Sequence, residues 1–134
     1  KADNPNQVLK ANPSVGSSSE CHCSSVGKCL LAFGRDVDLS VYEAHPLSVY
    51  TEYTISTVEK LKEELQDVRE KGYAIDREEL ELGLTCIGAP ILDRSGHAIA
   101  AISLSGPKSR MLAGDFCERV RAVTEAARKI SANF

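Results

Sequence analysis

The chain has 134 residues, enough for one domain with a single core, and 43% of them are hydrophobic against 26% charged. Its net charge of −3 argues against nucleic-acid binding, which needs clustered Lys and Arg to displace the counterions of the phosphates. No apolar stretch approaches the roughly 18 to 20 residues that span a bilayer, and the start lacks a signal-peptide core, so neither membrane insertion nor secretion is expected.

Cysteine and methionine usage adds two expectations. Five cysteines, an odd number without a framework spacing, favour the reducing cytoplasm. Because the chain starts at Lys1 and its one methionine is Met111, we expect it to be a piece of a longer protein. The run Cys21-His22-Cys23 lacks the spacing and the second ligand pair that zinc sites usually have, so no metal site is predicted.

The first elements are a strand and a helix. A short strand is predicted at residues 7–10, followed by a serine-rich loop. Ser24 or Ser25 can cap a helix that runs through residues 27–33 and ends at Gly34.

Gly27 lies in the first turn of this helix. A glycine there lets a ligand approach the free backbone N–H groups, and the positive end of the helix dipole favours an anion. The alternative is that Gly27 only permits close packing against the sheet.

Two more helices follow. Residues 36–44 predict a short helix, and Pro46 prevents its continuation. The run from Ser56 to Glu59 matches a capping box, and an apolar stripe then predicts an amphipathic helix that ends at Gly72. The stripe consists of Val58, Leu61, Leu65 and Val68.

The centre of the chain is a predicted β-hairpin at residues 83–107. A strand at residues 73–76 and an acidic loop precede it, which places Asp76 at a strand end near Cys86. Two apolar runs are separated by a polar turn at residues 93–96, as in antiparallel hairpins. Alternation assigns one face to the core, with Ile87, Ala89, Ile91, Ala98, Ala100 and Ile102.

The other face of the hairpin carries Cys86, Gly88, Ser103 and Ser105. A thiol, a glycine and two hydroxyls make a poor core, because buried hydroxyls need partners, but they suit a small polar ligand. Alternatively, these side chains lie under a helix or face water.

The register of the hairpin has two alternatives. Symmetric pairing about residues 94–95 puts Cys86 opposite Ser103, whereas a one-residue slip from a bulge at Gly96 puts Leu104 opposite Cys86. The hydrophobic pattern favours the symmetric register.

The chain ends in a predicted long amphipathic helix, with apolar residues at Phe116, Val120, Val123, Ala127 and Ile130. Hairpin-connected strands and the absence of a repeating βαβ pattern predict an α+β fold with an antiparallel sheet.

Three segments together resemble the effector-binding domain of the IclR family of bacterial transcription regulators: VGKCLLAF, HPLSVYTEYTIST and GYAIDREELELGLTCIGAPILDRSGHAIAAISLSGPKSRM. The resemblance covers residues 14–130, and its most specific parts are DREELELGLTCIGAPILD and AAISLSGP. It implies a GAF-like antiparallel sheet flanked by helices around a small-molecule pocket. Residues 1–134 would then be a partial C-terminal effector-binding domain, with a winged helix-turn-helix domain outside this chain.

The resemblance also implies a ligand site. In similar proteins the ligand touches a helix start, an aspartate, a cysteine and two serines, matched here by Gly27, Asp76, Cys86, Ser103 and Ser105. None of these is Lys or Arg, so an anion would rely on N–H groups and hydroxyls, while ionised Asp76 can only accept hydrogen bonds. We therefore expect a small organic acid that carries a hydroxyl or carbonyl group.

The function implied is that of a cytoplasmic transcription regulator, commonly a repressor, that forms a homodimer or homotetramer. The effector would change DNA affinity through the domain outside this chain, with no membrane partner and no cofactor. One alternative is an enzyme that uses Cys86 as nucleophile and His22 or His97 as base. The other is a pure oligomerisation module without a ligand.

Overall fold

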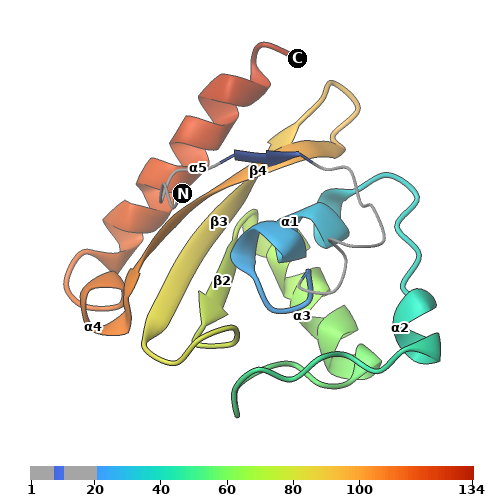
Figure 1. Cartoon of the computed structure of the whole chain (residues 1–134). Helices are drawn as coiled ribbons and strands as arrows, with labels where there is room; N and C mark the ends of the chain where they lie inside the picture. The colour runs from blue at the N-terminus through green and yellow to red at the C-terminus, as the bar shows by residue number, and fades with distance from the viewer. Residues whose placement is uncertain (1–7, 11–20) are drawn as a thin grey trace.

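The structure is a computed structural model that describes residues 8–10 and 21–134. Its sheet has four antiparallel strands in the order β1-β4-β3-β2, with helix α5 on one face and helices α1 and α3 on the other (Figure 1). The strands are β1 (Val8–Lys10), β2 (Ala74–Arg77), β3 (Leu84–Leu92) and β4 (Ala98–Pro107). The helices are α1 (Ser25–Phe33), α2 (Val41–Ala44), α3 (Val58–Lys71), α4 (Lys108–Met111) and α5 (Phe116–Ser131). Among these helices, none combines the length and apolar character needed to cross a membrane.

The predicted α+β class is confirmed, and most elements lie where the patterns placed them. Of the two candidate caps of α1, Ser24 is the one used, because its Oγ accepts the Gly27 N–H at 3.0 Å. Helix α3 begins one residue later than the capping-box pattern predicts. Thr57 rather than Ser56 is its N-cap, and the hydroxyl of Thr57 accepts the Lys60 N–H at 3.2 Å. The single turn of α4 was not predicted, since it is too short to show a helical period.

The predicted register of the hairpin is wrong by two residues. Cys86 lies opposite Ser105, and Gly88 lies opposite Ser103. One residue is taken up at the turn, where the Asp93 N–H bonds the His97 carbonyl at 2.8 Å and Gly96 has φ 87°. The second is taken up by a register shift between Ile91 and Leu92. Since side chains alternate with period two, the two shifts together leave the faces of residues 84–91 unchanged.

The predicted core face of the hairpin is buried and packs on α5, with one correction to its residues. The buried cluster on this face contains Ile87, Ala89, Ile91, Ala100, Ile102, Met111, Val123 and Ala127. Ala98 was expected on the same face, but it lies on the turn side of the shift and pairs with Leu92, so it belongs to the opposite face. Core burial therefore fixes the orientation of the hairpin, with the polar face turned toward α1.

The start of α1 lies directly on the polar face of the sheet. A Cβ added to Gly88 would be 2.9 Å from the backbone carbonyl carbon, Cβ and Oγ of Ser25, which is closer than real Cβ contacts. Gly88 thus has no side chain because the first turn of α1 occupies that space. This contact determines how near the helix start comes to Ser103, which pairs with Gly88.

We predict that Gly88→Ala destabilises the protein by about 1–3 kcal/mol, because the added methyl group must push the backbone of α1 away from the sheet. Urea unfolding measures the loss. Gly106→Ala is the matched control, since its methyl would meet only the flexible side chain of Met111, at 3.1 Å. Equal losses in the two variants would show that the contact between Ser25 and Gly88 is not tight.

Candidate ligand-binding site

Four of the five predicted site residues share one face of the sheet. Asp76 of β2 pairs with Cys86 of β3, which pairs with Ser105 of β4, so these three form one row across three strands. Ser103 lies in the adjacent row, beside Gly88. Asp76 is buried, whereas Cys86, Ser103 and Ser105 are partly exposed. The row thus runs from a buried carboxyl group to accessible hydroxyls.

The thiol at the centre of the row is poorly suited to act as a nucleophile. The hydroxyl of Ser105 donates to Cys86 Sγ at 3.0 Å. Burial raises the pKa of Cys86 to about 11; the Ser105 bond opposes this rise, and the nearby Asp76 carboxylate adds to it. Reactive cysteines are instead thiolates at neutral pH, so Cys86 is a polar contact rather than an attacking group.

Neither of the two candidate histidines is placed to act as a base for Cys86. His97 lies at the hairpin turn and bonds Ser95 Oγ through Nδ1 at 2.9 Å. At about 3.3 Å per residue along β4, its ring is more than ~20 Å from Cys86. His22 donates from Nε2 to the Ser48 carbonyl at 2.7 Å, which places it in the loop contact beside α1. Within residues 21–134, no three His, Cys, Asp or Glu side chains form a group that could hold a metal ion.

Asp76 is held in place by the turn that follows β2. Its Oδ1 accepts the Glu79 N–H at 2.8 Å, and only 1% of the residue is exposed. Burial raises the pKa of Asp76 to about 6, although the bond from Glu79 and the charge of Lys28 favour the ionised form. Two threonines before α3 also hold this turn. Thr51 Oγ1 donates to the Glu78 carbonyl at 2.6 Å, and Thr54 Oγ1 donates to the Glu79 carbonyl at 2.5 Å.

Gly27, the fifth predicted residue, lies in the first turn of α1, but its N–H is taken by Ser24. A Cβ on Gly27 would be 2.4 Å from Cys21 Cα. Gly27 therefore permits close packing, as in the alternative interpretation, but against Cys21 rather than against the sheet. The glycine that permits packing against the sheet is Gly88.

Sequence reasoning missed a buried ammonium group beside Asp76. Lys28 of α1 is fully buried, and its Nζ donates to Glu79 Oε2 at 2.8 Å, Glu64 Oε2 at 2.9 Å and the Ile75 carbonyl at 3.0 Å. Its three donors are thus all used. We refer to Lys28, Glu64, Asp76 and Glu79 as the ion cluster. The only signal in the sequence was one lysine within an apolar helix, VGKCLLAF.

Glu79 is the least satisfied member of the ion cluster. Its Oε2 accepts from Lys28 and from the Arg77 N–H at 3.2 Å, whereas its buried Oε1 has no partner among the described residues. Burial raises the pKa of Glu79, and the charge and hydrogen bond of Lys28 oppose the rise. One ammonium group therefore pairs with two carboxyl groups and acts electrostatically on a third, Asp76, and of the three only Glu64 is appreciably exposed.

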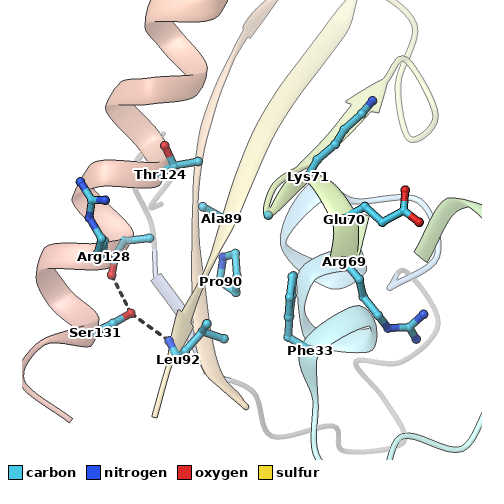
Figure 2. Close-up of a pocket in the computed structure, with 12 residues that line it drawn as sticks. Phe33, Arg69, Glu70, Lys71, Ala89, Pro90, Leu92, Thr124, Arg128 and Ser131 are labelled. Carbon is cyan, nitrogen blue, oxygen red and sulfur yellow. Dashed lines mark hydrogen bonds between the residues drawn. The ribbon is translucent and has the colours of Figure 1, made fainter. Parts of the chain in front are cut away.

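A separate groove of about 330 Å³ lies near the other end of β3, where the end of α3 and helix α5 flank residues 89–92 (Figure 2). Its lining is mostly apolar and includes Phe33, Ala89, Pro90 and Leu92 but none of the five predicted site residues. In Figure 2 the charged ends of Arg69 and Lys71 point away from Pro90. Arg69 Nε instead donates to the Ala32 carbonyl at 2.9 Å.

Comparison with known proteins connects this geometry to one family. The family model described as "Bacterial transcriptional regulator IclR C-terminal" matches residues 1–132. The regulator BhcR of Paracoccus denitrificans is 40% identical over 126 residues, 93% of this chain and 45% of that protein. The C-terminal domain of Escherichia coli KdgR has a TM-score of 0.74 at 42% identity, covering 84% of this chain and 69% of the solved chain.

A third similar protein was solved with a ligand. The inducer-binding domain of PobR from Acinetobacter, a double mutant in complex with 3-hydroxybenzoic acid, has a TM-score of 0.65 at 30% identity. The match covers 81% of this chain and 65% of the PobR chain. The present chain spans about half the length of the curated relatives it matches.

We predict that Lys28→Met destabilises the protein by about 3–5 kcal/mol, because it leaves Glu79 buried without its counter-charge. Urea unfolding at pH 7 measures the change. Lys62→Met on the exposed side of α3 is the control and should stay within about 0.5 kcal/mol. A loss below about 1 kcal/mol in Lys28→Met would mean that Glu79 readily reaches water or takes up a proton instead.

The raised pKa of Asp76 predicts a pH-dependent effect of Asp76→Asn. A carboxyl group whose pKa rises from 3.8 to about 6 on folding favours the folded state below pH 4, and this contribution is lost as the pH rises through 6. Asp76→Asn removes the ionisation, so its stability relative to wild type should increase by ~2–3 kcal/mol between pH 4 and pH 8. Unfolding in urea at both pH values tests this, with exposed Asp36→Asn as the control. An unchanged difference would contradict a raised pKa.

Proposed function

This chain belongs to the family of C-terminal domains of IclR-type bacterial transcription regulators, and on that premise we propose that it is the effector-sensing domain of a cytoplasmic regulator. The observation that carries the proposal is the row of Asp76, Cys86 and Ser105 across three strands, with Ser103 beside it. This face provides a hydrogen-bond acceptor, a thiol and two hydroxyls, which are groups that do not build an apolar core.

The ligand class that suits this face is a small organic acid with a hydroxyl or carbonyl group. The hydroxyls of Ser103 and Ser105 can donate to a carboxylate, and Asp76 can accept from a ligand hydroxyl or hydrated carbonyl. The double mutant of the related PobR inducer-binding domain forms a complex with 3-hydroxybenzoic acid, which combines a carboxylate with a hydroxyl group. That complex supports an acid of this kind as the effector here.

Regulation would follow from differential affinity. An effector that binds one arrangement of domains or subunits more tightly shifts the equilibrium toward it and so changes DNA affinity. DNA would be bound by a helix-turn-helix domain outside this chain, and the domains would pair as a homodimer or homotetramer. We expect the acid either to relieve or to strengthen repression of the target genes.

The relatives are named as transcription regulators, and the chain is accordingly a regulator domain rather than an enzyme. The raised pKa of Cys86 agrees with this conclusion. A pure oligomerisation module is the remaining alternative, and a ligand screen separates the two.

We expect at least one of glyoxylate, glycolate, pyruvate, lactate and 3-hydroxybenzoate to raise the melting temperature. An acid at a hundred times its Kd adds about 2.7 kcal/mol to the free energy of unfolding, which corresponds to several degrees. Ser103→Ala and Asp76→Ala should lose the shift, whereas Ser109→Ala, on the exposed turn α4, should keep it. No shift with any acid would favour the oligomerisation module. Conversion of an acid that is lost in Cys86→Ala would instead indicate an enzyme.

A further inference from the structure

The ion cluster and an anionic effector are in electrostatic conflict. With every group ionised, Lys28 contributes one positive charge against the three negative charges of Glu64, Asp76 and Glu79, a net charge of about −2 in a largely buried place. The three donors of Lys28 are already used by Glu64, Glu79 and the Ile75 carbonyl, so its ammonium group is not available to a ligand. A carboxylate placed beside Asp76 would add a further negative charge.

We propose that an anionic effector binds together with one proton, which is taken from solvent by the carboxyl group of Asp76 or Glu79. This inference rests on the proposed function, because it requires an acid at the row of Asp76, Cys86 and Ser105. The proton forms an O–H bond on a carboxylate oxygen when the ligand enters, and it returns to solvent when the ligand leaves. The net charge of the site therefore does not change, since one anion and one proton arrive together.

The physical reason is the cost of burying charge. A buried carboxylate next to a second negative charge neutralises rather than remains ionised. Asp76 and Glu79 are 1% and 6% exposed, so water cannot screen them from an incoming carboxylate. Glu79 also has a buried Oε1 without a partner among the described residues, which is an unused position for a proton or a hydrogen bond.

Groups on every neighbouring element agree with this assignment. On α3, Glu64 is 26% exposed and remains the water-facing member of the cluster. On β3, burial raises the pKa of the Cys86 thiol to about 11, so it stays protonated and neither neutralises nor adds charge near pH 7. On α1, Lys28 remains paired with both glutamates. The groups free to change protonation are therefore Asp76 and Glu79.

Protonation also gives the site a donor. An ionised Asp76 can only accept, whereas a protonated carboxyl group can donate its O–H to the carboxylate of the effector. Burial raises the pKa of Asp76 to about 6, so this proton can be taken up near neutral pH. An uncharged amide of the same acid brings no negative charge and should bind without proton uptake.

Isothermal titration calorimetry of the chain with glyoxylate, glycolate, pyruvate and lactate, in phosphate and in Tris, tests the proposal. These acids stay ionised above pH 6, so any proton taken up comes from the buffer and changes the heat. We expect uptake approaching one proton per acid bound, and an affinity that falls about tenfold per pH unit between pH 6.5 and 8.5. Glycolamide and lactamide, the uncharged controls, should show neither effect.

The variants locate the proton. The variant that removes the carboxyl group taking up the proton, Asp76→Asn or Glu79→Gln, should abolish the buffer-dependent heat and flatten the pH dependence of the affinity. Glu64→Gln should keep both effects. Binding of an acid with equal heats in the two buffers and constant affinity would overturn the inference while leaving the sensor function intact. Failure of these four acids and of 3-hydroxybenzoate to bind from pH 5.5 to 8.5 would overturn the proposed function and this inference with it.

Discussion

A single buried ammonium group, Lys28, connects the parts of this domain that surround the candidate site. It joins α1 to α3 through Glu64, to the turn after β2 through Glu79, and to β2 itself through the Ile75 carbonyl. A buried ion pair is weak evidence for stability as such, but removal of one partner leaves an uncompensated charge. The arrangement of α1 over the polar face, and with it the contact of Ser25 on Gly88, is thus tied to the same atoms that surround Asp76.

The chemistry of the site follows from this arrangement. The sheet supplies a row of neutral or acceptor groups. The ammonium group of Lys28, which lies beside this row, is already paired with Glu64 and Glu79. The proposed recognition of an acid therefore relies on hydroxyl donors and on a carboxyl group that can change its protonation, rather than on a cationic side chain. Under the proposed proton uptake, sensing would depend on proton activity as well as on effector concentration.

The groove beside residues 89–92 is separate from the candidate ligand site. It lies where β3 extends beyond β2, and this edge offers few donors to another strand. Pro90 has no N–H, and the Leu92 N–H is bound by Ser131 Oγ at 2.9 Å. The edge is therefore protected against strand addition, as natural sheets require. The carboxyl, thiol and hydroxyl groups of the candidate site lie on the face beneath α1, and none of them lines this groove.

The sequence by itself determined the longer helices and strands, the antiparallel hairpin and the faces of its strands up to the bulge, because period-two and period-3.6 patterns are local. It also placed Asp76 near Cys86. The pairing of Cys86 with Ser105 was decided by the turn geometry and a bulge, each of which shifts the register by one residue without a visible sequence period. The ion cluster was likewise decided by the tertiary structure. Lys28 meets Glu64 and Glu79 across 36 and 51 residues of chain, and only the packing of α1 between α3 and the sheet brings those charges together.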